Sequence, residues 1–283
     1  MRIHAPAKIN LCLYLGPRRE DGLHELCSLF EPVAFADPIE ISEAERDEVV
    51  CPGVEGENLA ARALAALRER GWNAPPLRVE IEKRIPVAAG LGGGSADAAA
   101  VLRLARDPTA WPDGELPDLH EIAAGLGADV PSQLNPSLAL VQGIGEQIEL
   151  LPDPAPHAVV LLPGGGGLST AEVFAEADRL GLGRESADLD LRAASLHAAA
   201  GSGASPLDYA DLLTNDLEPA ARSLRPDIGD ALDALRDAGA PFAFLTGSGP
   251  TAVGLFGATA SAKSAAAQLG RDDAIVCEAG RAP

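Results

Sequence analysis

The segment at 86–100 holds the residue types in this sequence that are best suited to chemistry. Four glycines in close succession are followed directly by a serine: Gly90, Gly92, Gly93, Gly94 and Ser95. Glycines let the backbone approach a ligand closely, and the first amides of a following helix have no intrahelical partner. With the positive end of the helix dipole, this arrangement predicts a polyphosphate site. The Ser95 hydroxyl would add a donor to phosphate or help to hold a metal ion.

Two common phosphate-binding motifs do not fit this segment. The P-loop places Lys and then Ser or Thr after its last glycine, whereas here Ser95 follows Gly94 directly. The glycine spacing is not that of the Rossmann motif either, and no acidic strand end follows at the usual distance. A plain strand-to-helix turn is the alternative, but one or two glycines would be enough for it.

The segment lies between an expected strand and an expected helix in a chain where the two alternate. Apolar patterns predict strands at 2–15, 38–42, 77–83, 138–142, 146–150, 158–162, 242–245 and 252–256. They predict helices at 59–70, 95–106, 119–126, 170–180, 218–224, 228–238 and 260–269. The Ala/Gly/Ser-rich stretch at 183–205 is expected to be irregular. The fold class is therefore α/β or α+β, and the break at 153–156 predicts domains at 1–152 and 153–283.

Composition excludes several classes of protein. The formal net charge of −20, with 42 acidic against 22 basic residues, argues against a nucleic-acid partner. The scattered Cys12, Cys27, Cys51 and Cys277 form no C-x-x-C pair, which argues against a zinc site and fits a reducing compartment. The first residues lack the apolar run of a signal peptide or membrane span. We therefore expect a cytoplasmic protein with no membrane partner.

Three segments, in this order, resemble the motifs of the GHMP kinases, the superfamily of galactokinase, homoserine kinase and mevalonate kinase. They are Pro6–Leu11, Pro86–Ala96 and Leu245–Thr251. Further segments resemble the members that phosphorylate 4-diphosphocytidyl-2-C-methyl-D-erythritol in the non-mevalonate isoprenoid pathway: Ala5–Leu11, Arg19–Leu26, Leu126–Pro131 and Thr214–Glu218. The resemblance covers almost the whole chain.

The resemblance implies a two-lobed fold with its active site in the cleft between the lobes. The N-terminal lobe would be of the ribosomal protein S5 domain 2-like type and the C-terminal lobe ferredoxin-like. It also implies ATP as phosphate donor, with Mg²⁺ as its counter-ion and no dedicated protein metal site. The acceptor would be a small molecule, a cytidyl diphosphate sugar alcohol phosphorylated at the 2-hydroxyl of its methylerythritol moiety.

The same motifs imply residue roles. Asp129 would accept the proton of the attacking hydroxyl, with Lys8 beside it to keep the carboxylate ionised and to stabilise charge. The residues implied in ATP binding are Asn58, Lys83, Pro86, Val87, Ala88, Ala89, Gly90, Leu91, Gly92, Gly93, Gly94, Ser95 and Ala96. Those implied in acceptor binding are Asn10, His24, Thr170, Phe174, Gly247 and Ser248.

Each of these residues also has a structural interpretation when taken alone. Asp129 and Asn58 are typical helix caps, and Lys8 and Lys83 are ordinary strand lysines. One position departs from the family pattern, because Leu23 stands where members commonly have a tyrosine that stacks on the cytosine. Leu keeps apolar contact but loses base stacking, which is worth ~1–3 kcal/mol.

Two other functions are compatible with the motifs. The first is a GHMP kinase for homoserine or a mevalonate-type alcohol, and the segments Arg19–Leu26 and Leu126–Pro131 argue against it. The second is a nucleotide-binding relative without catalysis, and the presence of both Lys8 and Asp129 argues against it.

Overall fold

The computed structural model describes residues 1–54, 56–107, 110–111 and 116–283. Its strands are β1 (Arg2–Arg18), β2 (His24–Glu43), β3 (Glu48–Val50), β4 (Leu77–Ile81), β5 (Ala139–Gly143), β6 (Gln147–Leu150), β7 (His157–Leu162), β8 (Phe242–Leu245), β9 (Ala252–Phe256) and β10 (Ile275–Ala279). Its helices are α1 (Leu59–Glu69), α2 (Gly93–Leu104), α3 (Leu119–Leu126), α4 (Val130–Gln133), α5 (Thr170–Leu180), α6 (Ser186–Ala200), α7 (Glu218–Leu224), α8 (Asp227–Asp237) and α9 (Thr259–Leu269), with a 3₁₀ helix η2 (Pro206–Leu212). The expected mixed α/β class is confirmed.

Most predicted elements are present, but the stretch at 183–205 is not irregular. It contains the helix α6, whose buried side chains are Leu189, Ala193, Leu196 and Ala200. Their spacing of three to four residues is the apolar stripe of a helix. The prediction failed because small residues were read as loop-forming, although alanine has the highest helix propensity. The strands β3 and β10 and the short helix α4 were also not predicted.

The hairpin of β1 and β2 is the longest feature of the sheet. The strand predicted at 38–42 is only the end of β2, which pairs with β1 over most of its length. The second strand also pairs with β4 near one end and with β5 near the other. Through the single pair Ala279–Val33, β10 joins it to β7, β9 and β8. Strands from both halves of the chain therefore form one sheet, and the proposed boundary at 152/153 falls between β6 and β7.

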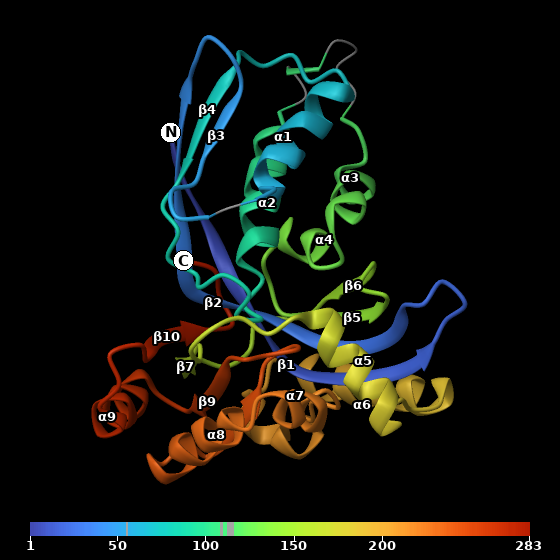
Figure 1. Ribbon diagram of the computed structural model, residues 1–283, viewed down its shortest axis with the longest axis vertical. Helices are drawn as coiled ribbons and strands as arrows, with labels where there is room; N and C mark the ends of the chain where they lie inside the picture. The colour runs from blue at the N-terminus through green and yellow to red at the C-terminus, as the bar shows by residue number, and fades with distance from the viewer. Residues whose placement is uncertain (55, 108–109, 112–115) are drawn as a thin grey trace.

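The helices lie in two groups at opposite ends of the molecule. Figure 1 shows α1 to α4 at the same end as β3 and β4, with α3 and α4 on the side of α1 and α2 away from these strands, and α5 to α9 at the other end. Asn58 begins α1, since its Oδ1 accepts from the amide of Ala60 at 2.8 Å. The helix α2 packs against both α1 and β1, and alanines let it approach them closely.

One core cluster, which includes Ile9 and Val159, spans both halves of the chain. Among the described residues, no helix has the length and apolar character to cross a membrane.

Candidate active site

A cleft of about 1200 Å³ lies between β1, β2, the start of α2 and the helix α5. Among the residues expected at the site, those that line it are Lys8, Asn10, His24, Asn58, Lys83, Pro86 to Ser95, Asp129, Thr170, Phe174, Gly247 and Ser248. Ala96 differs from the expectation because its side chain is fully buried and its amide bonds to the Gly92 carbonyl at 2.9 Å. It offers a ligand neither surface nor a free donor.

The glycine-rich segment meets the start of α2 as its sequence predicts. Gly92 is the N-cap residue in the left-handed conformation, with φ at +67°. The first intrahelical bond goes to the amide of Ala96, so the preceding amides are available to an anion. Gly90 has φ at +78°, and a Cβ built there would lie 2.9 Å from the carbonyl oxygens of Thr246 and Gly249. Glycine is therefore required at 90 for both its backbone conformation and the close approach.

Lys8 and Asp129 face each other in the cleft. The Lys8 Nζ atom lies 3.2 Å from Asp129 Oδ2 and donates to Asn10 Oδ1 at 2.6 Å. It also lies 4.4 Å from the centroid of the Phe30 ring, close enough for a cation–π contact. Lys8 is buried, whereas the Asp129 side chain is 34% exposed to the cleft. The pair thus presents a carboxylate to a ligand while the ammonium group is fixed behind it.

The turn that follows β8 is bonded to both β1 and the glycine-rich segment. The Thr246 hydroxyl accepts from the amide of Asn10 at 2.7 Å, and the Thr251 hydroxyl donates to the Ala89 carbonyl at 2.6 Å. Both threonines are fully buried. The hydroxyls of Ser248 and Thr170 lie 2.9 Å apart at the cleft surface. This turn therefore fixes the distance between the phosphate segment and the strand that carries Lys8.

Lys83 lies at the side of the phosphate segment between two buried carboxylates. Its Nζ atom is 2.6 Å from Asp37 Oδ2 and 2.7 Å from Asp97 Oδ2. Burial lowers the pKa of Lys83, but the two carboxylates outweigh this effect, so its pKa lies above the ordinary value. Burial also raises the pKa of Asp97, to about 7, although Lys83 opposes the change. Lys83 lines the cleft, but its charge is balanced by the protein itself.

The far end of the cleft contains a histidine and an aromatic ring. The His24 and Phe174 ring centroids lie 5.4 Å apart at a tilt of 42°. His24 Nε2 lies 2.7 Å from Asp178 Oδ1, and Arg18 Nε lies 3.8 Å from Asp178 Oδ2. Leu23 lines the cleft here and is 50% exposed. This end has the flat apolar and polar groups that a nucleobase requires.

Comparison with known proteins decides the family. Residues 58–135 match the model of the GHMP kinases N terminal domain, and residues 193–274 match that of the GHMP kinases C terminal domain. A 4-diphosphocytidyl-2-C-methyl-D-erythritol kinase of Mesorhizobium japonicum is 38% identical over 94% of this chain and 90% of its own. Another, of Mycolicibacterium gilvum, is 41% identical over 95% of this chain and 85% of its own. The chain belongs to the 4-diphosphocytidyl-2-C-methyl-D-erythritol kinases of the GHMP family.

A solved structure supports membership of this GHMP kinase family independently. The crystal structure of a 4-(cytidine 5'-diphospho)-2C-methyl-D-erythritol kinase superposes with a TM-score of 0.82. It is 33% identical in sequence, and the match covers 99% of this chain and 100% of that one. The assignment made from the motifs is confirmed, and so is the GHMP kinase fold. The chain is a small-molecule kinase.

The kinase family implies a divalent cation. The cleft residues fit a cation that is held mainly by the phosphate oxygens of the substrate. Among the described residues, no group of three or more His, Cys, Asp or Glu side chains has the arrangement of a metal site. Ser95 and Asp129 line the cleft beside the phosphate segment. A hydroxyl and a carboxylate are ligands that suit Mg²⁺, which otherwise keeps its waters and the phosphate oxygens.

Several residues of this kinase site were given no role by reasoning from the sequence, although Thr246 and Thr251 lie in one of its motifs. They are Arg18, Phe30, Asp37, Asp97, Asp178, Thr246 and Thr251. Helix spacing would have found Asp178, because it lies four residues after Phe174 and so shares a face of α5 with it. Asp97 lies two residues after Ser95 in the segment that the sequence did single out. Asp37 has no such local signal, because it meets Lys83 only through the pairing of β2 with its neighbours.

Proposed function

We propose that this chain transfers the terminal phosphate of ATP to the 2-hydroxyl of 4-diphosphocytidyl-2-C-methyl-D-erythritol, in the cytoplasm, for isoprenoid precursor synthesis. The observation that supports this most is the Lys8–Asp129 pair, separated by 3.2 Å, in the cleft that the phosphate segment also lines. A carboxylate, an ammonium group and an anion site in one cleft are what phosphoryl transfer to an alcohol requires.

The chemistry assigned to the pair is proton acceptance and charge stabilisation. Asp129 takes the proton of the acceptor hydroxyl as that oxygen attacks the terminal phosphorus atom. The bond from this phosphorus to the bridging oxygen breaks, and ADP leaves with that oxygen. Lys8 favours the ionised carboxylate and stabilises negative charge on the acceptor and the phosphate. The amides at the start of α2 bind the donor phosphates. Mg²⁺, held by Ser95 or Asp129 and by phosphate oxygens, would neutralise part of the polyphosphate charge.

The acceptor is proposed to extend from Asn10 toward His24. Phe174 would lie against the cytosine ring, and His24 would hydrogen-bond to the polar edge of the base. Asp178 holds His24 by its Nε2 atom at 2.7 Å, which fixes the orientation of the imidazole. Thr170 and Ser248 line the same wall of the cleft.

A substrate panel tests the proposal. The purified chain is given ATP, Mg²⁺ and one alcohol at a time: the cytidyl acceptor, homoserine or mevalonate. We expect ATP consumption that depends on the cytidyl acceptor, with a product heavier by one phosphate group in mass spectrometry. Turnover of homoserine or mevalonate without turnover of the cytidyl acceptor would indicate another GHMP kinase. ATP binding without consumption in the presence of any of these alcohols would indicate a non-catalytic relative.

A further inference from the structure

The residues at 212–217, here called the bridging segment, form hydrogen bonds with strand β1 on the C-terminal side of Lys8 and Asn10. The Leu13 amide donates to the Thr214 carbonyl and the Asp216 amide donates to the Leu13 carbonyl, both at 2.8 Å. The Tyr14 hydroxyl donates to the Leu212 carbonyl. These bonds hold β1 three and four residues after Asn10.

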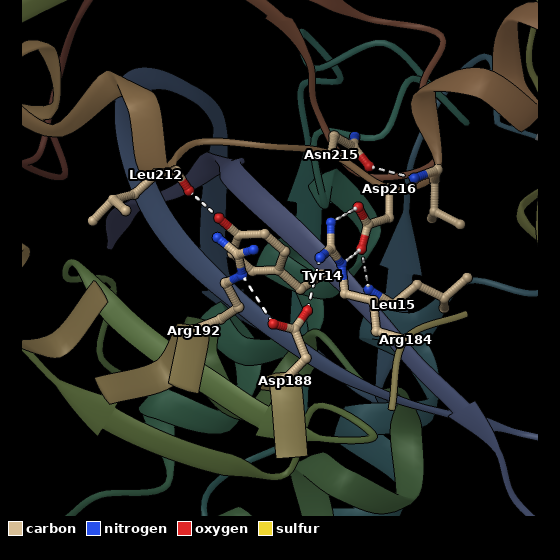
Figure 2. Close-up of polar contacts among 9 residues, drawn as sticks. Tyr14, Leu15, Arg184, Asp188, Arg192, Leu212, Asn215 and Asp216 are labelled. Atoms are coloured by element: carbon tan, nitrogen blue, oxygen red, sulfur yellow. Dashed lines mark hydrogen bonds and ion pairs between the residues drawn. The ribbon is translucent and has the colours of Figure 1, made fainter. Parts of the chain in front are cut away.

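Asp216 and Arg184 add further bonds between the bridging segment and β1. Asp216 Oδ2 accepts from the Leu15 amide at 3.0 Å, and the two Asp216 oxygens accept from Arg184 at 2.5 and 2.7 Å. Figure 2 shows this ion pair, with the Tyr14 ring beside Arg184 and Arg192. The hydrogen bonds to Asp216 hold the pKa of Arg184 above its ordinary value. None of these contacts reaches the turn that follows β8.

Asn215 precedes Asp216 in the bridging segment, but its side chain bonds to the turn that follows β8 rather than to β1. Its Nδ2 group donates to the carbonyl oxygens of Leu245 at 2.7 Å and Gly247 at 2.8 Å. Its Oδ1 atom accepts from the Leu217 amide at 2.9 Å, so the buried amide is fully bonded. A side-chain amide provides two donors and an acceptor at once, whereas a carboxylate provides no donor.

The turn held by Asn215 lies directly against the catalytic residues. Gly247 has φ at +57°, and a Cβ built there would lie 3.1 Å from Asn10 Oδ1. That same Oδ1 atom accepts from Lys8 Nζ at 2.6 Å. Gly247 and Ser248 line the cleft. The contacts therefore run from Asn215 through Gly247 and Asn10 to Lys8.

We propose that Asn215 is a positioning residue, which sets the turn at Gly247 and Ser248 against Asn10 and thereby shapes the acceptor side of the cleft. In the sequence, Asn215 stood out only as part of the family-like segment Thr214–Glu218. The donor side depends less on Asn215, because Thr251 holds the phosphate segment through the Ala89 carbonyl. Loss of the Asn215 amide should therefore affect the acceptor more than ATP.

Asp216→Asn provides a matched control. Asp216 is the next residue, its side chain is similarly buried, and it holds β1 without touching the turn. In steady-state assays with the cytidyl acceptor, Asn215→Ala should lower kcat/KM for the acceptor by about tenfold or more, with KM for ATP within about twofold of the wild type. Asp216→Asn should lower the thermal midpoint and leave both KM values within about twofold.

The isosteric Asn215→Asp separates hydrogen bonding from packing. It keeps the shape but cannot donate to the two carbonyls, so it should impair acceptor use at least as much as Asn215→Ala. If Asn215→Ala does not fold, Asn215→Ser, which retains one donor, is measured in its place. The proposal would be overturned if the acceptor kinetics matched those of Asp216→Asn. It would also be overturned if KM rose equally for ATP and for the acceptor.

This inference rests on the proposed function, and the experiment separates the two. Wild-type turnover of the cytidyl acceptor is measured first, and its absence counts against the proposed function alone. The variants are then compared with whichever alcohol the substrate panel identifies. A wild type that is active beside Asn215 variants of unchanged kcat/KM for the acceptor counts against the role of Asn215 alone.

Discussion

The ammonium group of Lys8 lies 3.2 Å from the carboxylate of Asp129, and Asn10 holds the same ammonium group at 2.6 Å. The two residues come from β1 and from the start of α4, more than a hundred residues apart in the chain. Lys8 is buried against Phe30, so its charge is directed at Asp129 rather than at water. The carboxylate remains open to a ligand.

Replacing either residue should reduce turnover much more than stability. Asp129→Asn and Lys8→Met should each lower kcat by ~10²–10⁴-fold, the usual contribution of general-base catalysis. ATP binding, measured by titration calorimetry, should persist because the phosphate segment is unchanged. Lys263→Met is the control, since Lys263 is an exposed lysine on α9. A loss of kcat smaller than tenfold in Asp129→Asn would remove this residue from the mechanism.

A methyl group at Gly90 should disrupt the contact between the phosphate segment and the turn after β8. Gly90→Ala requires a positive φ and places Cβ 2.9 Å from two carbonyl oxygens. The positive φ alone costs about 1–2 kcal/mol. We expect a lower free energy of unfolding and weaker ATP binding. Gly125→Ala, at an exposed helical position with nothing within 4 Å, should instead stabilise by up to about 1 kcal/mol.

The pKa of Asp97 gives stability a defined pH dependence. In the folded chain this pKa is raised to about 7, by burial first and by Asp37 as well, against 3.8 for an ordinary aspartate. Between these values the folded state binds more protons than the unfolded state, so stability falls as pH rises from about 4 to about 7. The free energy of unfolding of the wild type should therefore fall over this range relative to that of Asp97→Asn.

Asp47 is a control of opposite sign. The guanidinium of Arg68, at 2.7 and 2.9 Å, holds the pKa of Asp47 below its ordinary value. The stability that Asp47 contributes is present above its unfolded pKa and is lost as pH falls through its folded pKa. Denaturant titrations from pH 3 to 8 distinguish the two residues. Parallel curves for Asp97→Asn and the wild type would contradict the Asp97 prediction.

Leu23→Tyr should strengthen binding of the acceptor. Leu23 lines the cleft near His24 and Phe174 and is half exposed, so a larger ring has room to lie against a base. Stacking is worth ~1–3 kcal/mol, which corresponds to a KM for the acceptor lower by about 5–150-fold. KM for ATP should not change. Leu191→Tyr, on the exposed face of α6, should change neither value.

Local patterns in the sequence were enough for the phosphate segment and most of the secondary structure. Gly90 to Gly92 lie between β4 and α2, and the helix begins at Gly93, two residues before its predicted start. Glycine content and helix starts are local properties, so the sequence could indicate both. The helix α6 was missed because its small residues were read as loop-forming, although alanine favours a helix. The strand β10 was missed because its pairing with β7 depends on residues more than a hundred positions away. The pairing of Lys8 with Asp129 was inferred only from the family motifs.

The sequence by itself determined the family, the anion-binding segment and the identity of the residues around it. The tertiary structure alone decided which charged side chains are available to a ligand in the cleft. Lys8 and Lys83 look alike as strand lysines, but Lys83 lies between the buried Asp37 and Asp97, whereas Lys8 faces one carboxylate in an open cleft. Only the fold turned Asn215 toward the Gly247 carbonyl and Asp216 toward Leu15. The physical reason is that burial and pairing depend on groups brought together from distant parts of the chain, which no local pattern records.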